Sequence, residues 1–245
     1  MDLSLIIPCF NESEGVSQMR KQLEAARPAF DQRGTWELVF IDDGSTDDTF
    51  EHLSSTFSDW KNVRIVRHDH NRGLAAGLRT GFAQATGDIV VVTDSDGTYP
   101  FTTIPELLDC MTPDVDIVTS SAYHPRGGVD GVPAHRLLFS QSASLIYRLI
   151  VDWHVHTYTA MYRAYRRKVI ERLPITTEGY LVMAQLLVDA LLAGYHVAEY
   201  PTVLRVRQYG QSKAKIWRIT RQHLRFQAGV IWRRISETRR RFGRA

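Results

Sequence analysis

The sequence predicts an α/β protein with a mostly parallel, Rossmann-like central sheet flanked by helices. Short apolar runs rich in Val and Ile alternate with helical patterns along the 245 residues, as expected for successive βαβ units. The run at residues 89–92 is β-branched throughout, which is typical of a strand buried on both faces of a parallel sheet. No apolar run approaches the ~18 residues of a membrane span, and the chain is long enough for a sizeable core.

Five strands are expected in the first half of the chain, at residues 3–7, 36–41, 63–66, 89–93 and 116–119. A helical pattern follows the first strand and reaches about Ala26. After the second strand, Asp43-Gly44 predicts a turn, because both residue types are common in tight turns. Ser45 or Thr46, followed by Asp48, predicts a helix N-cap with acids in the first turn.

A further helix is expected after Asn71-Arg72-Gly73, with Gly73, Gly77 and Gly81 spaced four residues apart. Such glycines leave one side of a helix without bulk, which suits close packing on the sheet or a nearby ligand.

The second half is predicted to begin with a Gly- and Pro-rich loop at residues 123–133. It continues with a helix at 134–151, a strand at 158–165, a short helix from 166, a helix at 178–193 ended by Gly194, and a last strand at 197–206. The tail is expected to be helical from about 215 to 241, with one apolar stripe formed by Trp217, Leu224, Ala228, Ile231 and Ile235.

The formal net charge of +3 hides a strong asymmetry, because residues 205–245 hold thirteen Lys/Arg and a single acid, Glu237. A basic stretch of this kind attracts nucleic acid, acidic lipid or a phosphorylated ligand. The chain has no RNA-binding aromatic motif and no zinc-finger pattern, so nucleic acid is not an expected partner. Two interpretations of the tail stay open: a helix on an anionic membrane surface, or a helix packed on the domain with solvated charges.

Cys9 and Cys110 are the only cysteines, and neither has a Cys or His at metal-binding spacing. Two thiols form no disulfide framework, and no signal-peptide pattern is present, so we expect a reducing, cytoplasmic compartment.

Asp94 and Asp96 directly follow the β-branched run. Ligands bind at the carboxyl ends of strands in open α/β sheets, so these carboxylates are placed to share a hard divalent cation with the oxygens of a diphosphate. The alternative is a simple polar turn at the end of a strand.

Several separated motifs, in this order and at this spacing, resemble the family 2 inverting glycosyltransferases. They are Ile7-Pro8-Cys9-Phe10-Asn11-Glu12, the run DDGSTDDT at 42–49, Asn71-Arg72-Gly73 and Asp94-Ser95-Asp96. Two later motifs, YRAYRR at 162–167 and RQYGQSK at 207–213, resemble the branch of dolichyl- or polyprenyl-phosphate sugar synthases. The resemblance covers residues 3 to about 215 and implies a GT-A fold.

The resemblance also implies where a nucleotide-sugar donor sits. The loop formed by Pro8, Phe10, Asn11 and Glu12, with Asp42 and Asp43, would hold the base and ribose, and Gly73, Asp94, Ser95 and Asp96 would complete the donor site. For Glu12 and Asp42, helix-start capping remains the alternative. By family analogy we favour GDP-mannose, with a UDP-hexose such as UDP-glucose close behind.

Asp94 and Asp96 are expected to hold Mg²⁺ or Mn²⁺, and with Arg207 they are the predicted catalytic residues. Thr98 stands where the synthases often have Gln, and its hydroxyl can coordinate the metal or hold a water.

The acceptor is expected to be a polyprenyl phosphate at the cytoplasmic face of a membrane. A phosphate monoester has a second pKa near ~6 and needs no general base, but it needs cations to place it. The predicted phosphate-binding residues are Arg126, Arg136, Ser140, Arg207, Ser212 and Lys213. Arg126 is included because Ala122 stands where the synthases often have Arg, and Arg126 lies four residues further on. A separate difference is Gln185, which stands where the synthases often have an acid.

We expect residues 1–214 to form the catalytic domain, with a nucleotide-sugar half (1–120) and an acceptor half (121–214), followed by a basic amphipathic helix at 215–245. One competing hypothesis keeps the donor and replaces the acceptor by a saccharide or other hydroxyl compound. A nucleic-acid-binding protein is a more distant alternative, and a dinucleotide oxidoreductase is disfavoured because no Gly-x-Gly-x-x-Gly follows the first strand.

Overall fold

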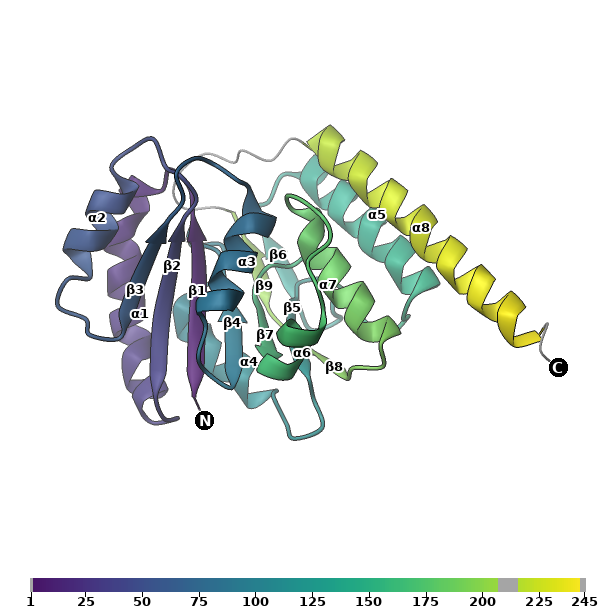
Figure 1. The fold of residues 1–245 in the computed structure, drawn as a ribbon, viewed down its shortest axis with the longest axis horizontal. Coiled ribbons are helices and arrows are strands. Elements are labelled where there is room, and N and C mark those ends of the chain that lie inside the picture. The colour runs from purple at the N-terminus through teal and green to yellow at the C-terminus, as the bar shows by residue number, and fades with distance from the viewer. Residues whose placement is uncertain (1, 207–215, 243–245) are drawn as a thin grey trace.

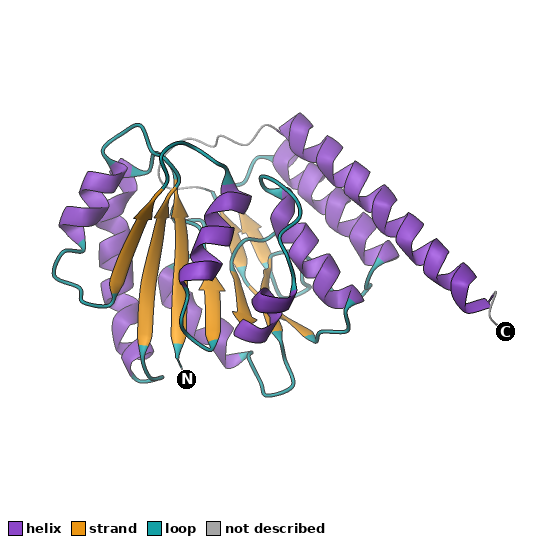
Figure 2. Ribbon diagram, in the orientation of Figure 1, coloured by secondary structure: helices purple, strands orange, loops and turns teal. Residues whose placement is uncertain are grey.

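The computed structural model describes residues 2–206 and 216–242 and has helices on both faces of a seven-stranded central sheet (Figures 1 and 2). The strand order is β3-β2-β1-β4-β7-β5-β8, and only β7 runs antiparallel to its neighbours. The prediction of a mostly parallel sheet flanked by helices is therefore confirmed. The strands are β1 Leu3–Cys9, β2 Trp36–Asp42, β3 Val63–Arg67, β4 Ile89–Val92, β5 Ile117–Ser121, β6 Gly128–Asp130, β7 Arg163–Arg166, β8 Val197–Pro201 and β9 Val203–Arg205.

Alternate residues of each central strand enter different halves of the core, as the two-residue period of a strand requires. In β1, Leu5 and Ile7 pack with α1, α2 and α4, whereas Ile6 packs with α3, α5 and α7. The helices are α1 Val16–Asp31, α2 Thr49–Thr56, α3 Leu74–Gln84, α4 Ile104–Asp109, α5 Ala134–Ile150, α6 Arg167–Arg172, α7 Leu181–Leu192 and α8 Ile216–Phe242, with short 3-10 turns at Ser13–Gly15 and Phe101–Thr103.

The glycines of α3 face the sheet, as their spacing predicted. A Cβ on Gly81 would overlap the side chain of Ile6, and one on Gly77 would touch Ile41 and Pro8. Close packing of α3 on β1 and β2 therefore accounts for the absence of bulk at these two positions.

The strand predicted at 158–165 is wrong over its first half, because β7 begins only at Arg163. The backbone carbonyls of Tyr158 and Ala160 both accept hydrogen bonds from the buried guanidinium of Arg163, at 3.4 and 3.1 Å. Residues 158–162 form an irregular segment, and these two carbonyls face the Arg163 side chain.

The strand predicted at 197–206 is also wrong in part, since it is divided at Thr202 into β8 and β9. β8 pairs with β5 in the main sheet, whereas β9 pairs with β6 in a separate two-stranded sheet. Pro201 ends β8 and has no N–H to continue a ladder, which favours the change of partner. The strand β6 lies inside the segment predicted to be a loop.

Two helix starts differ from the predictions. α7 begins at Leu181, after Gly179 with φ +60°, and not at 178. α2 has Asp48 at its N-cap position, and Ser45 and Thr46 do not cap it because their side chains face the loop that follows β1.

α8 packs against α5 and α7 through a face that contains the buried residues His223, Gln227 and Val230 (Figure 1). The stripe predicted from the sequence lies beside this face and is largely exposed: Trp217 is 81 % and Leu224 55 % exposed, although Leu224 also borders a cavity between α5 and α8. Among the residues that the structure describes, no helix combines the length and the apolar character needed to cross a bilayer.

Candidate functional site

A cavity of about 250 Å³ lies at the carboxyl ends of β1, β2 and β4, where ligands of open α/β sheets bind. Two of the ten predicted donor-binding residues, Asn11 and Asp42, do not line this cavity. The other eight do, and they are Pro8, Phe10, Glu12, Asp43, Gly73, Asp94, Ser95 and Asp96. The structure therefore brings residues from four separate motifs to one place.

Asn11 joins the loop after β1 to the loop after β2. It is the one described non-glycine residue with a positive φ, 54°. Its backbone N–H donates to Ser45 Oγ at 2.9 Å, and its side-chain Oδ1 accepts the N–H of Thr46 at 2.8 Å. Asparagine tolerates this conformation better than most residues and supplies both an acceptor and a donor. Asn11 therefore fixes the loop after β1 against the loop after β2, beside the cavity.

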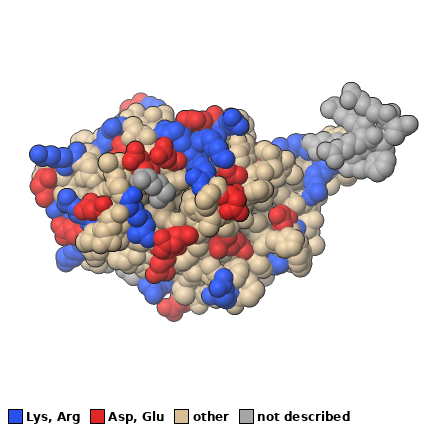
Figure 3. Space-filling view, turned by 90° about the horizontal axis from the view of Figure 1, so that it is seen from below, with Lys and Arg blue, Asp and Glu red and all other residues tan. Residues whose placement is uncertain are grey.

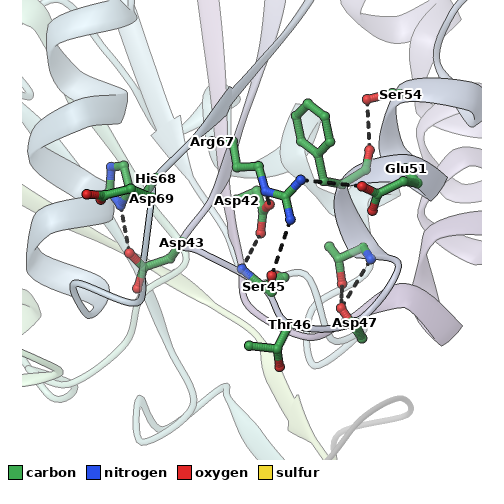
Figure 4. Close-up of polar contacts among 12 residues, drawn as sticks. Asp42, Asp43, Ser45, Thr46, Asp47, Glu51, Ser54, Arg67, His68 and Asp69 are labelled. Carbon is green, nitrogen blue, oxygen red and sulfur yellow. Dashed lines mark hydrogen bonds and ion pairs between the residues drawn. The ribbon is translucent and has the colours of Figure 1, made fainter.

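Asp43, which lines the cavity, also joins two loops, and Figure 4 shows its contact with His68. Its Oδ1 lies 2.7 Å from His68 Nδ1 and accepts the N–H of Arg72 at 3.0 Å, while Oδ2 accepts the N–H of Gly73 at 2.7 Å. The carboxylate thus holds the Asn71–Gly73 loop and the start of α3 beside the cavity. Next to it, Gly44 has φ +67°, and a Cβ there would overlap the backbone of His70.

Asp42 is fully buried and points away from Asp43 toward Arg67 (Figure 4). Its Oδ1 accepts the N–H of Ser45 at 3.0 Å, and its Oδ2 lies 3.2 Å from Arg67 Nε. Arg67 also lies over the ring of Phe50, with its guanidinium carbon 4.7 Å from the ring centroid. These contacts hold the turn after β2, and the donor-binding role of Asp42 stays a prediction.

Asp94, Ser95 and Asp96 form the wall that follows β4. Asp96 is only 6 % exposed, and its Oδ1 accepts the backbone N–H of Thr98 at 3.0 Å, across Gly97 with φ +76°. This turn aligns the Asp94 and Asp96 side chains on the cavity, whereas Thr98 lines the neighbouring one.

Cys9, at the end of β1, also lines the cavity but is not a nucleophile. Burial raises the pKa of its thiol well above the ordinary value, and the nearby Glu12 and Asp42 carboxylates raise it further. The thiol therefore stays protonated at neutral pH.

A second cavity, of about 200 Å³, adjoins the first, and a third, of about 300 Å³, lies between α5 and α8. The second shares Leu74, Asp94, Met161 and Tyr180 with the first, and its other lining residues include the hydroxyl-bearing Tyr123, Ser140, Thr157 and Thr159. The third, which we call the α5–α8 groove, is mainly apolar and is lined by Phe139, Ala143, Ile146, Ile219 and Leu224, among others. The three cavities form a continuous series from Asp94 to the C-terminal helix.

The predicted phosphate-binding residues are only partly brought together. Arg136 and Ser140 line the α5–α8 groove, and Ser140 lines the second cavity as well. Arg126 is exposed and lines none of the three cavities; its charge instead lowers the pKa of Cys110 against the larger effect of burial, which raises it. Arg207, Ser212 and Lys213 lie outside the described residues.

Gln185, which stands where the related synthases often have an acid, is fully buried and lines none of the three cavities. Its amide donates to Pro174 O and Asp189 Oδ2, and its Oε1 accepts the N–H of Thr176. It therefore ties the loop before α7 to the helix.

Sequence reasoning missed Tyr180, Met161 and Thr159, which line two or more of the cavities. One signal was available, because Gly179 at the start of the predicted helix favours a turn that leaves Tyr180 outside the helix. Thr159 gave no such signal, since it was placed within a strand.

Comparisons with known proteins identify the family and the fold of the chain. Residues 4–173 match the sequence profile described as "Glycosyl transferase family 2". The chain is 28 % identical over 217 residues to a "Dolichol-phosphate mannosyltransferase" of Pyrococcus furiosus, covering 88 % of this chain and 60 % of that protein. It is 29 % identical over 221 residues to a "Polyprenol monophosphomannose synthase" of Mycolicibacterium smegmatis, covering 85 % of this chain and 79 % of that protein.

Among solved structures, glucosyl-3-phosphoglycerate synthase from Mycobacterium tuberculosis is similar in fold. Its complex with Mn²⁺, UDP and glucosyl-3-phosphoglycerate gives a TM-score of 0.70 at 22 % identity, covering 93 % of this chain and 80 % of that one. Its complex with Mg²⁺ and UDP gives 0.69 at 20 % identity, covering 93 % and 79 %.

The family match and the fold together define a glycosyltransferase of the GT-A type. The chain belongs to glycosyl transferase family 2. It spans about 60 % of the length of the Pyrococcus protein that it matches.

Proposed function

We propose that this enzyme moves a hexose, with mannose favoured, from a nucleotide diphosphate sugar to a polyprenyl phosphate. The observation that carries the proposal is the continuous series of cavities from Asp94 and Asp96 to the apolar α5–α8 groove. A donor needs the polar end of this series, and a lipid tail needs the apolar end. The names of the Pyrococcus and Mycolicibacterium relatives support the same substrate classes.

The donor is assigned to the cavity at the strand ends. Asp43, with the loop from Pro8 to Glu12, would accept hydrogen bonds from the base and ribose, and Gly73 at the start of α3 would lie near the diphosphate. Asp42 does not line the cavity, and its predicted part in donor binding would need the turn after β2 to rearrange. GDP-mannose is our first choice for the donor, and UDP-glucose is the second.

A divalent cation fits the residues present. Two carboxylates from one turn, Asp94 and Asp96, line the same cavity, and oxygen ligands of this kind suit Mg²⁺ or Mn²⁺. When bound there with the diphosphate, the cation would supply the positive charge that stabilises the departing nucleoside diphosphate. The Mn²⁺ and Mg²⁺ complexes of the structural relative support this assignment.

The acceptor phosphate is its own nucleophile, because it is mostly dianionic at neutral pH. One of its oxygens attacks the anomeric carbon as the bond from that carbon to the donor diphosphate breaks, and the electron pair leaves with the nucleoside diphosphate. Attack opposite the leaving group inverts the anomeric configuration. Arg136, at the groove, is the described cation best placed to hold the phosphate, and Arg207 with Lys213 are predicted to assist it.

We also place the α5–α8 side of the enzyme on an anionic membrane surface. Trp217 and Trp232 are 81 % and 71 % exposed, and Trp is favoured where apolar and polar surroundings meet. From residue 217 to 236, α8 carries five arginines and no acid. By contrast, acidic and basic side chains are interspersed on the face shown in Figure 3. Co-sedimentation with anionic and with neutral vesicles would test this placement, and equal binding to both would refute it.

The central experiment offers the purified chain Mg²⁺ or Mn²⁺, GDP-mannose or UDP-glucose, and either a polyprenyl phosphate or the matching free polyprenol. Lipid-linked sugar is expected with polyprenyl phosphate as acceptor and not with free polyprenol. Equal glycosylation of the alcohol would contradict the assignment of a phosphate nucleophile. Transfer to a saccharide but to neither lipid would replace the proposed acceptor by a hydroxyl compound.

A further inference from the structure

The three cavities meet at a few side chains between the sheet edge and the C-terminal helix. Tyr180 lines all three cavities, whereas Ser140 and Thr159 line both the second cavity and the α5–α8 groove. An acceptor that extends from the groove toward Asp94 must pass this junction. In the proposed reaction, the reacting end of the acceptor would therefore approach the donor past Tyr180, Ser140 and Thr159.

Thr159 and Met161 are the partly exposed residues of the segment 158–162, and of these two Thr159 carries a hydroxyl. Residues 157, 158 and 160 are buried, whereas Thr159 is partly exposed. Its Oγ1 lies 2.7 Å from Ser140 Oγ on α5, so the two hydroxyls form a pair at the junction. A hydroxyl pair of this kind can accept one hydrogen bond internally and donate the remaining O–H to an anion.

The position of Thr159 is set by Arg163, whose side chain is fully buried. Its Nη2 donates to the carbonyls of Tyr158 and Ala160, the residues on either side of Thr159, at 3.4 and 3.1 Å. Its other nitrogens donate to Thr119 Oγ1 at 3.1 Å, Tyr165 Oη at 3.2 Å and Met183 O at 2.8 Å. All five hydrogen bonds go to neutral oxygens.

A buried guanidinium whose hydrogen-bond partners are all neutral is unusual, because arginine stays charged and buried charges are normally paired. Dipoles satisfy its donors but do not cancel its charge. Met183 and Ala160, whose carbonyls it binds, both line the second cavity. The charge therefore lies just behind a cavity wall, where it favours an anion.

The beginning of the same segment is held by an acid. Glu199 on β8 accepts the backbone N–H groups of His156 and Thr157 at 2.8 and 3.2 Å, and its Oε2 lies 2.6 Å from His156 Nδ1. His124 lies next to this pair, and the potential ligand atoms of the three residues lie within 4.8 Å of one another, close enough to share a metal ion. Because both oxygens of Glu199 already accept hydrogen bonds from the segment, we interpret the group as a second anchor of residues 156–160.

We propose that Thr159 contacts the phosphate of the acceptor, with its hydroxyl donating a hydrogen bond to a phosphate oxygen, and that Arg163 is the positioning residue that holds it at the junction. This inference rests on the proposed function for the identity of the acceptor. No proton leaves Thr159 during transfer, because the phosphate already carries the attacking electron pair.

The first test compares Thr159→Val, which removes the hydroxyl, with Thr159→Ser, which keeps it, using polyprenyl phosphate as acceptor. Thr159→Val should lower kcat/KM for the acceptor by about ten- to a hundredfold, as expected for one hydrogen bond to a charged group. Thr159→Ser should stay within about threefold of wild type, and donor affinity by calorimetry should be unchanged in both. Thr56→Val is the matched control, because Thr56 is also partly exposed but ends α2, away from the cavities.

Wild-type kcat/KM in Thr159→Val would overturn the inference while leaving the proposed function intact. If the wild type glycosylates only a different acceptor, the proposed function is wrong, and this result alone does not decide the role of Thr159. The same three variants measured with that acceptor then decide whether Thr159 contacts it, and an unchanged kcat/KM would again overturn the inference.

The second test concerns Arg163→Lys, which keeps the charge but cannot hold the carbonyls on both sides of Thr159. It should lower kcat/KM for the acceptor at least as much as Thr159→Val does, with donor affinity retained. The double variant should be no worse than Arg163→Lys alone, because Thr159 is then already misplaced. Additive losses, or a loss of donor affinity equal to the loss of acceptor kcat/KM, would show that Arg163 does not act through Thr159.

Discussion

At the carboxyl ends of β1 and β2, short polar side chains tie one loop to the next, whereas α5 and α8 meet largely through side-chain packing and leave a groove between them. Asn11 and Asp43 together make hydrogen bonds to the backbone of Thr46, Arg72 and Gly73. Between α5 and α8, Gln227 Nε2 donates to Ala143 O, and a buried bond joins Tyr147 to His223.

The difference fits the two ligands proposed for these regions, a nucleotide at the strand ends and a lipid tail in the α5–α8 groove. A nucleotide has a defined set of donors and acceptors, so its site benefits from loops held in one arrangement. A polyprenyl tail has no polar pattern to match and needs apolar surface of adaptable shape. Changes at the donor end should therefore act through charge and hydrogen bonding, and changes at the acceptor end through packing.

The largest effect is expected at the donor end, from Asp96→Asn. This change preserves shape and removes one ligand charge from the predicted metal site, where a cation is worth several kcal/mol of transition-state stabilisation. Transfer should fall by about a thousandfold or more, since each 1.36 kcal/mol is a factor of ten. Initial rates with Mg²⁺ and with Mn²⁺ would measure the effect.

Asp94→Asn should behave in the same way, and EDTA should abolish the wild-type reaction. Thermal unfolding serves as the control that both variants fold. Full activity of the double variant in EDTA would end the hypothesis of a metal-dependent donor site.

The next effect concerns the acceptor end and pH. Burial lowers the pKa of His223 from 6.5 to about 4, and its Nδ1 lies 2.9 Å from the hydroxyl of Tyr147. Because the folded pKa lies below the unfolded one, the unfolded chain takes up the proton first as the pH falls. The free energy of unfolding should therefore decrease from about pH 6.5 and level off below about pH 4, by a total on the order of 3 kcal/mol.

His223→Gln keeps a polar side chain near Tyr147 and does not titrate. Urea unfolding followed by tryptophan fluorescence at pH 7 and pH 5 should show a smaller pH dependence in this variant than in wild type. The same dependence in both proteins would show that His223 is not the group responsible, and that the junction of α5 and α8 is not the acid-sensitive part of the molecule.

A smaller effect is expected from Asp42→Ala. If the carboxylate binds the base or ribose, donor affinity should weaken by about 1–3 kcal/mol. Because Asp42 is buried against Ser45 and Arg67, calorimetric titration with nucleoside diphosphate and metal should be paired with a stability measurement. Lower stability with unchanged affinity would assign Asp42 to holding the turn, and the donor contact would then fall to Asp43.

The sequence could predict that residues of the separate motifs lie around one cavity, because they follow strands that end at the same edge of the sheet. Strand ends of a parallel sheet lie at one edge, so residues placed after β1, β2 and β4 had to converge. What could not be predicted is which carboxylate faces the cavity. Asp42 and Asp43 are adjacent, and the two-residue period of a strand sends their side chains in different directions.

The acceptor end was harder to predict for a physical reason. The alternation at 158–165 is typical of a strand, but residues 158–162 are irregular and two of their carbonyls bind one buried arginine. The groove likewise depends on how α8 rests on α5, which follows from the tertiary placement of His223, Gln227 and Val230. Helical periodicity identified the apolar stripe of α8 but not that the stripe borders the packed face and is largely exposed.

The smallest effect tests whether the groove holds a lipid tail. Leu224 lines the groove and is 55 % exposed, so Leu224→Ala removes apolar surface that a tail would cover. At ~0.8 kcal/mol for each buried CH₂, discounted for partial exposure, the loss should be about 1 kcal/mol, or roughly a fivefold increase in KM. Leu138→Ala is the matched control, because Leu138 is 63 % exposed on α5 but does not line the groove.

The increase in KM should appear with a long polyprenyl phosphate and disappear with a very short one, since only the long tail reaches Leu224. If Leu138→Ala and Leu224→Ala raise KM equally, or if chain length makes no difference, the tail does not occupy the groove, and the contrast between a polar donor end and an apolar acceptor end would need a different explanation.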